Sequence, residues 1–151
     1  MKRTPLVRRA ALRATSILRS TAPRPVPPGT RARLAVRSGG LCELWLPEVC
    51  TGRPGIARDV HHRVTVKMGG RHGEARVGHD RLSNLLHVCR RCHGYVTADP
   101  AQSYLAGWSL REFQVPSVEP VTYRGAAVYL DDEGGREMLG VPRHACVRRS
   151  L

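Results

Sequence analysis

The sequence predicts a small α+β domain that depends on a bound zinc ion and follows a disordered, basic N-terminal arm. The 151-residue chain is 41% hydrophobic but contains only one Phe, two Trp and four Tyr, so its core must be small. Domains with small cores often rely on a metal ion for stability. Four cysteines in two pairs offer such a site, and short strand and helix patterns lie between and after them.

The positive charge of the chain is concentrated at its N-terminus. The formal net charge is +13, and residues 1–37 contain ten Lys and Arg residues and no acidic residue. A strongly basic chain predicts a polyanionic partner, with DNA or RNA ahead of an anionic membrane surface. No apolar run approaches the roughly 20 residues that cross a bilayer. We therefore expect a nucleic-acid partner, no membrane insertion and a cytoplasmic location.

Residues 1–30 are predicted to form the flexible basic arm. Five prolines bracket this segment, and the run from Pro23 to Gly29 cannot form a helix or a central strand. Such an arm can lie along phosphates without reading bases. Two other interpretations stay open, a solubilising tail and, because the arm contains Arg and Ser but no acids, an organellar transit peptide. No clean apolar segment follows the charges, which disfavours a secretory signal.

A central domain is predicted over residues 31–110. Residues 31–41 are expected to form a short helix that ends at the glycine pair 39–40, since glycine favours helix C-termini. The β-branched alternation over residues 60–66 predicts a strand. A second, apolar strand is expected just before Cys89, and a helix is expected to begin after it.

The C-terminal extension, residues 111–151, is expected to hold a short β-hairpin. Residues 121–130 predict two short strands around Gly125, and a turn is expected to follow over residues 131–135. A short helix over residues 99–113, opened by Asp99–Pro100 and broken at Gly107, is expected to lead into the extension. The sequence assigns no role to the extension.

Four cysteines predict a structural zinc site, and its ligands would be Cys42, Cys50, Cys89 and Cys92. Four thiolates can surround a zinc ion tetrahedrally, and the two-residue spacing of the second pair is typical of a zinc knuckle. The seven-residue spacing of the first pair is longer than usual. Buried free thiols are the alternative. A disulfide framework is disfavoured, since the cysteine number is odd and no export signal is evident; Cys146 is assigned nothing.

The second cysteine pair also matches a haem-attachment motif. Residues 89–93 fit the C-x-x-C-H pattern to which c-type haem is attached. That attachment requires export through a signal that the chain does not show. It would also leave the first cysteine pair and the paired histidines unexplained, so zinc is favoured.

His61 and His62 lie in the first predicted strand, where adjacent side chains point to opposite faces. One histidine can therefore bind a metal ion while the other faces a substrate. Plain exposure to solvent is the alternative for such a pair. His87 is expected to make a structural hydrogen bond, and Trp108 is expected to belong to the core.

The order of these motifs resembles the zinc-containing branch of the HNH endonucleases, and it is closest to the small enzymes encoded by phages and actinobacterial genomes. The residues that carry the resemblance are Cys42, Cys50, His61, His62, Asn84, Cys89, Cys92 and His93. The resemblance covers about residues 38–110. Asn84 precedes His93 by nine residues, a spacing that is typical of the family.

The resemblance implies a ββα-metal fold, also called a His-Me finger, within the nuclease domain 31–110. It places strands near residues 59–65 and 85–88 and a helix near residues 90–98. The implied activity is metal-dependent hydrolysis of phosphodiester bonds in double-stranded DNA, with 5′-phosphate and 3′-hydroxyl products.

The resemblance also implies a role for each polar residue of the motif. His62 matches the general base, and Asn84 matches the residue that holds the loop and orients the base. His61 and His93 match the ligands of a catalytic divalent cation, for which Asp59 is a candidate third ligand. The position at which some members of the family carry a second helix histidine is Thr97 in this chain.

These residue types suit the chemistry of phosphodiester hydrolysis. A neutral imidazole can take a proton from the attacking water near neutral pH. A divalent cation can stabilise the negative charge that develops on the phosphate and on the leaving oxygen. Histidine ligands suit Mn²⁺, Ni²⁺, Co²⁺ or Zn²⁺, whereas Mg²⁺ is abundant and can take oxygen ligands from the phosphate. The choice of catalytic cation stays open.

Basic residues near the motif are candidate DNA contacts. Arg63, Lys67 and Arg71 lie beside or within the glycine-rich loop that follows the paired histidines, with ordinary surface charge as the alternative. Arg90 and Arg91 begin the helix that carries His93, so at least one is expected to contact a phosphate.

Two functions are compatible with the sequence. The favoured function is a phage-type endonuclease that works beside the DNA-packaging machinery, with terminase proteins as partners; that setting rests on the resemblance alone. The alternative is a zinc-bound DNA-binding module without catalysis, which would not require the general base, the ligands and the bracing Asn84. The target sequence, the oligomeric state and the choice between nicking and cutting both strands stay open.

Overall fold

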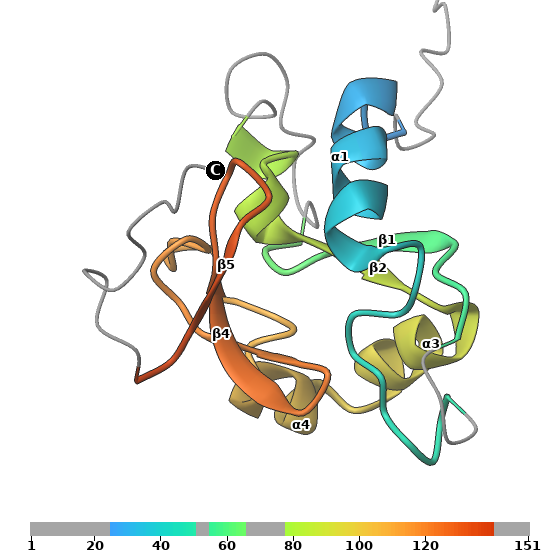
Figure 1. Cartoon of the computed structure of the whole chain (residues 1–151). Helices are drawn as coiled ribbons and strands as arrows, with labels where there is room; N and C mark the ends of the chain where they lie inside the picture. The colour runs from blue at the N-terminus through green and yellow to red at the C-terminus, as the bar shows by residue number, and fades with distance from the viewer. Residues whose placement is uncertain (1–24, 51–54, 66–77, 141–151) are drawn as a thin grey trace, which may run out of the picture.

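The computed structural model describes residues 25–50, 55–65 and 78–140. They form a small mixed α/β fold with two small antiparallel sheets (Figure 1). The elements, in chain order, are α1 (Pro28–Ser38), β1 (Asp59–His62), η1 (Leu82–Asn84), β2 (Leu85–Val88), α3 (Arg90–Ala98), α4 (Pro100–Leu105), β3 (Val121–Tyr123), β4 (Ala126–Leu130) and β5 (Arg136–Met138). Within those ranges, no helix is long and apolar enough to cross a membrane.

Several predictions concern residues outside the described ranges. These are the arm over residues 1–24, the two loop residues Lys67 and Arg71, and Cys146. The DNA contacts expected of the arm, Lys67 and Arg71 therefore stay predictions.

Helix α1 ends where its sequence predicts but begins earlier, at Pro28, so the prediction that the run from Pro23 to Gly29 cannot form a helix is wrong at its last two residues. Its first turn contains Pro28, which suits a position that needs no backbone N–H donor. Gly39 has a φ of 63°, in the left-handed region that glycine adopts easily, and its N–H bonds to the carbonyl of Val36. The buried residue Leu34 packs α1 against Val26, Leu82 and Leu85.

Strands β1 and β2 form an antiparallel ribbon that is followed directly by α3. Asp59 pairs with Val88 at one end of the ribbon, and His62 pairs with Leu85 at the other. The predicted strand at 85–88 and the predicted helix at 90–98 are confirmed. The first strand is shorter than predicted, because the N–H of Val64 bonds to the Asn84 side chain instead of a strand partner.

The predicted β-hairpin is also confirmed. Strands β3 and β4 are joined by a turn in which Arg124 and Gly125 both have positive φ angles, 48° and 84°. Strand β5 was not predicted, because its three residues are largely exposed and show no apolar alternation. The predicted helix around residue 100 is confirmed in a shorter form, α4.

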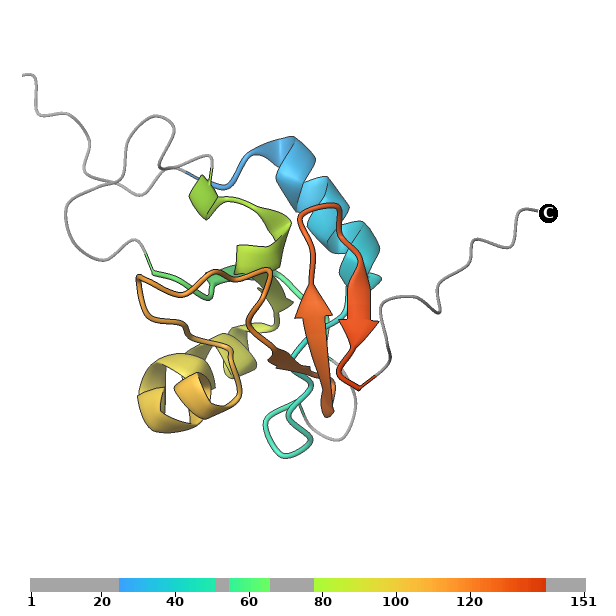
Figure 2. The same ribbon diagram turned by 90° about the vertical axis from the view of Figure 1, so that its left-hand side faces the viewer.

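One core connects the two sheets. It comprises Cys42, Leu44, Cys50, Leu86, Val88, Cys89, Cys92, Val96, Ala106, Trp108, Val121, Tyr123, Val128 and Leu130. Strands β3 and β4, which belong to the predicted C-terminal extension, therefore share a core with the cysteines. Figure 2 shows α1 at one end of the molecule and α3 and α4 at the other, with the strands between them.

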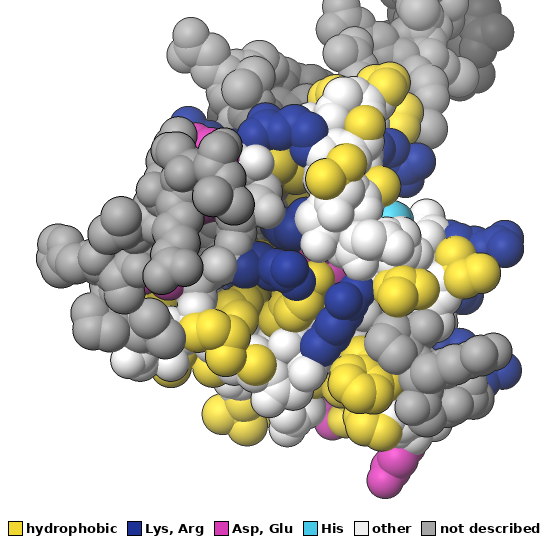
Figure 3. Space-filling model, in the orientation of Figure 1, with side chains coloured by type: hydrophobic (Ala, Val, Ile, Leu, Met, Phe, Trp, Pro, Cys, Tyr) yellow, Lys and Arg dark blue, Asp and Glu magenta, His cyan; other side chains and the backbone are white. Residues whose placement is uncertain are grey.

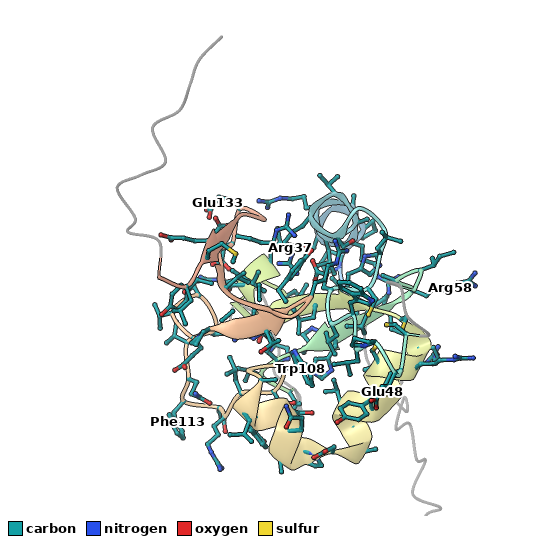
Figure 4. All side chains as sticks on the ribbon, turned by 60° about the horizontal axis from the view of Figure 1, so that its bottom comes forward. Arg37, Glu48, Arg58, Trp108, Phe113 and Glu133 are labelled. Atoms are coloured by element: carbon teal, nitrogen blue, oxygen red, sulfur yellow. The ribbon has the colours of Figure 1, made fainter. Side chains whose placement is uncertain are left out.

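A fully buried ion pair joins α1 to the segment that follows it. The Nε and Nη2 atoms of Arg37 lie 2.8 and 2.7 Å from the two carboxylate oxygens of Glu43. Arg37 also donates to the carbonyls of Leu82 and Leu85, at 2.8 and 2.6 Å. Figure 4 shows Arg37 pointing from α1 into the protein. The pair thus connects α1, the cysteine-bearing segment and β2.

Candidate functional site

The four cysteines that were predicted to bind zinc meet in the core. The sulfur atoms of Cys42, Cys50, Cys89 and Cys92 all lie within 4.8 Å of one another, and all four side chains are buried. Four thiols at this separation can hold one metal ion such as zinc. The prediction that these four cysteines lie together is therefore confirmed.

Backbone hydrogen bonds place these sulfur atoms. Cys89 caps the N-terminus of α3, where its sulfur accepts the N–H of Cys92 at 3.4 Å. The N–H of Cys50 bonds to the carbonyl of Leu46 at 2.6 Å. A hydrogen bond from the Cys92 side chain lowers the pKa of Cys42 despite its burial. Cys42 therefore favours the thiolate, the form in which cysteine binds metals, whereas burial raises the pKa of Cys89 and the hydrogen bond to Cys42 raises that of Cys92.

His61 lies on the face of β1 that contacts α3. Its side chain is buried, and its Nε2 atom lies 2.9 Å from the carbonyl oxygen of Trp108. A carbonyl can only accept a hydrogen bond, so Nε2 carries the proton and Nδ1 keeps a free lone pair. Burial lowers the pKa of His61 to about 4, so the ring is neutral near pH 7. A neutral imidazole that donates to a backbone carbonyl is typical of a metal ligand.

His62 has different contacts from His61, as strand alternation predicts. Its Nε2 atom lies 2.9 Å from Oδ1 of Asp80. Its ring stacks on that of His79, with 4.6 Å between centroids and 8° between planes. Since a carboxylate accepts the Nε2 proton, Nδ1 is left to accept another. The His62 side chain remains 22% exposed, so water can reach it.

Asn84 ties the chain after His62 to the segment that carries His79 and Asp80. Its Oδ1 accepts the N–H of Val64 at 2.8 Å, and its Nδ2 donates to the carbonyl of His79 at 2.8 Å. The Asn84 side chain is buried, so no water replaces these bonds. This is the geometry that a loop-bracing residue requires.

His93 lies on α3, beside Asp59 and His61. Its Nδ1 atom is 3.1 Å from Oδ2 of Asp59, and its ring centroid is 5.5 Å from that of His61. A surface pocket of about 390 Å³ adjoins it, lined by Arg90, His93, Gly94, Thr97 and Ala98. We call this the α3 pocket.

The predicted ligands of the catalytic cation are neighbours but do not form a closed group. Asp59, the candidate third ligand, bonds to His93 and lies 3.3 Å from Nη2 of Arg90. In the part of the chain that the structure describes, only the four cysteines bring three or more such ligand atoms together. His61 and His93 therefore offer two imidazoles near each other, with oxygen ligands still to be supplied.

Arg63 does not make the DNA contact predicted for it. Its side chain is fully buried, so no phosphate can reach the guanidinium. It donates at 2.8 to 3.2 Å to the backbone carbonyls of Ser83, Gly107, Pro116, Glu119 and Pro120. The structure thus gives Arg63 a structural role, which fixes the segment that also supplies the carbonyl acceptor of His61.

The remaining candidate residues in the described ranges have the exposure or the contacts that the sequence predicted for them. The Arg90 side chain is 84% exposed, and Arg91 is exposed in the first turn of α3. His87 makes a structural hydrogen bond, with Nδ1 2.7 Å from the Ser38 hydroxyl, and burial lowers its pKa. Trp108 is buried in the core, and its Nε1 donates to the carbonyl of Thr122 at 2.8 Å.

Sequence reasoning missed two residues of the site, His79 and Asp80. Both follow the glycine-rich loop, and the sequence predicted no role for either of them. The sequence held a weak indication of Asp80, because a carboxylate shortly before Asn84 can reach the strand that carries His62. A comparison of the chain with models of known families, with curated proteins and with solved structures found no match.

Proposed function

We propose that this protein is a metal-dependent endonuclease of the HNH type that hydrolyses phosphodiester bonds in double-stranded DNA. The observation that carries the proposal is the β1–β2–α3 unit. That unit presents an oriented imidazole, His62, beside a pair of neighbouring imidazoles, His61 and His93. The four-cysteine group at the start of α3 supports a structural zinc ion next to this unit.

In this proposal His62 is the general base. Its Nδ1 takes the proton of the attacking water, and Asp80 holds the ring in that tautomer and stabilises the imidazolium that forms. Asp80 acts through His62 and is therefore a positioning residue. Asn84 fixes the backbone on both sides of this pair.

His61 and His93 are the residues that would hold a divalent cation. Nδ1 of His61 is unprotonated, and the ring is held by its bond to Trp108, so this donor fits a metal ion. A bound cation would supply Lewis-acid stabilisation of charge on the phosphate. Arg90 and Arg91 lie near enough on α3 to contact the phosphates.

A plasmid-cleavage assay tests the proposal. Supercoiled plasmid would be incubated with Mg²⁺ or Mn²⁺ and the parental protein, the His62→Ala variant or the parental protein with EDTA. We expect nicked or linear product only from the parental protein with metal, and a loss of about 10²- to 10⁴-fold in the variant. Asp80→Asn should lower the cleavage rate while leaving the affinity for DNA and the zinc content unchanged.

Two results would contradict the proposal in different ways. A His62→Ala variant that cuts at the parental rate would show that His62 is not the base. Plasmid that is retarded on a gel but never cut with any of the metals would favour the DNA-binding module. A phage setting with packaging partners rests on the family resemblance alone.

A further inference from the structure

A second pocket, of about 290 Å³, lies between α1 and β1. It is lined by Arg31, Ala32, Leu34, Ala35, Ala57, Arg58, Val60 and His87. Val60 and His87 are paired across the β1–β2 ribbon, so both side chains lie on the same face of it. That face packs on α1 through Val60 and Leu34, whereas His61 lies on the other face, against α3. We call this cavity the α1–β1 pocket.

The rim of the α1–β1 pocket is basic. Arg31 and Arg58 are both exposed, and no acidic residue lines the pocket. Figure 4 shows Arg58 extending away from the protein, and Figure 3 shows a histidine surface beside α1 with basic side chains near it. The floor is made of small and aliphatic side chains. The pocket therefore combines an apolar floor with positive charge at its edge.

Most other arginines of the described residues already have partners. Arg33, Arg37, Arg63, Arg81, Arg90 and Arg124 bond to carbonyls or carboxylates, and Arg111 and Arg136 lie over tyrosine rings. Among these same described residues, no carboxylate pairs with Arg31, Arg58 or Arg91, and of these three Arg31 and Arg58 line the α1–β1 pocket. Two unpaired guanidinium groups beside one pocket are suited to an anion that comes from outside the protein.

We propose that the α1–β1 pocket holds a backbone phosphate of a bound DNA duplex, contacted by Arg31 and Arg58, with the adjoining deoxyribose on the apolar floor. The DNA partner rests on the proposed function. The charge of the chain supports this ligand, because residues 1–24 carry seven Lys and Arg residues and no acid, and Arg31 lies in the first turn of α1, which begins at Pro28.

The position of the pocket is compatible with a duplex that also reaches the candidate active site. Val60 and His62 are two residues apart in β1, so their side chains share one face, and Arg58, directly before the strand, lines the same pocket as Val60. Four residues of strand span about 13 Å, which is less than the length of DNA that a small domain covers. One duplex can therefore contact the pocket and His62 together.

The salt dependence of DNA binding tests this proposal. Binding of a fluorescent duplex would be measured by anisotropy over a series of NaCl concentrations, in the His62→Ala background so that no cleavage intervenes. Each phosphate contact adds about one unit to the slope of log K against log [NaCl]. We expect Arg31→Gln and Arg58→Gln each to lower the slope by about one unit, and the double variant by about two. Arg58→Lys should retain the parental slope.

Matched controls are Arg111→Gln and Arg136→Gln, which remove exposed arginines that lie over tyrosine rings elsewhere. They should change the slope much less. Equal slopes for pocket and control variants would overturn the proposal, as would a parental chain that binds no duplex DNA at low salt. Because binding is measured without cleavage, a protein that never cuts DNA would contradict the proposed function and leave this test intact.

Discussion

His61 and His62 are adjacent in the chain, but their surroundings suit them to different chemistry. The His61 ring is enclosed by α3 and the Trp108 backbone, so desolvation keeps it neutral and its Nδ1 unprotonated. The His62 ring is partly exposed, and the Asp80 carboxylate accepts its Nε2 proton, so Nδ1 is left to accept another. Strand alternation separates the two rings, and tertiary contacts then suit His61 to the ligand and His62 to the base of the proposed function.

The pKa of His61 leads to a prediction about stability and pH. Its folded-state pKa of about 4 lies below the ordinary value of 6.5, so the unfolded chain binds this proton more readily. Its contribution is fully present above pH 6.5 and is lost as the pH falls toward 4. The free energy of unfolding should drop by at most about 3 kcal/mol from this group over that interval. Urea denaturation at several pH values would measure it.

The matched variant for this measurement is His61→Asn, which keeps a donor for the Trp108 carbonyl but has no proton to gain. Acid release of a metal from the cysteines would affect both proteins equally. The decline between pH 6.5 and 4 should therefore be shallower in His61→Asn. Identical declines in the two proteins would show that His61 is not buried as a neutral ring.

At the scale of elements, α3 carries parts of both sites. Its N-terminus holds Cys89 and Cys92, two of the four cysteines that could bind a metal ion, and His93 follows directly. Gly94 follows on the same helix and lines the α3 pocket. A Cβ at Gly94 would meet no atom within 4 Å, and its φ is not in the left-handed region. The fold itself therefore does not require glycine at position 94. Glycine in a helix interior is destabilising by about 1 kcal/mol relative to alanine.

If the proposed function holds, DNA that approaches His93 closely at the α3 pocket would explain Gly94, and this makes a prediction. Gly94→Ala and Gly94→Leu should both stabilise α3 by about 1 kcal/mol, which would raise the midpoint of thermal unfolding by a few degrees. Gly94→Leu should nevertheless weaken DNA binding or cleavage by about tenfold, equivalent to about 1.4 kcal/mol, because its side chain fills the pocket. Differential scanning fluorimetry and the plasmid assay would measure the two effects.

Gly29 provides the control, since it is another exposed helical glycine with free space around its Cβ position. Gly29→Leu should leave cleavage unchanged. Cleavage at the parental rate by Gly94→Leu would mean that DNA does not occupy the α3 pocket.

At the scale of the whole molecule, the cysteine group joins segments that are far apart in the sequence. The core around Cys42 and Cys92 includes Trp108 and side chains from β3 and β4. The aromatic residues are few, so the sulfur atoms form a large part of the packed centre. Loss of a metal ion from this position should therefore affect the C-terminal sheet as well as the β1–β2–α3 unit.

Metal removal tests this connection. Treatment with a zinc chelator under reducing conditions should abolish the near-UV circular dichroism signal of Trp108, because four cysteines without a metal cannot hold the core segments together. Amide exchange should accelerate in β3 and β4 together with α3. Added Zn²⁺ should restore both signals, and added Mg²⁺ should not. A metal-free protein with unchanged spectra and exchange would rule out a structural metal.

Local sequence determined the elements that depend on neighbouring residues. Gly39 ends α1 because glycine adopts a left-handed φ at little cost, and Gly125 with Arg124 forms the β3–β4 turn in the same region. The Cys89–Cys92 spacing places both sulfurs at one helix start, and the alternation in β1 separates His61 from His62. Each of these features involves residues within a few positions of one another, so a single sequence is enough to predict it.

Tertiary structure alone decided the roles that depend on distant segments. Arg63 looks like a DNA contact in sequence, but five carbonyls from residues 83–120 converge on its guanidinium and bury it. Asp80 lies 18 positions from His62, and the two meet where Asn84 bonds to Val64 on one side and to His79 on the other. A buried charge or a proton-accepting pair is defined by the groups that surround it in space, and chain spacing does not specify which groups those are.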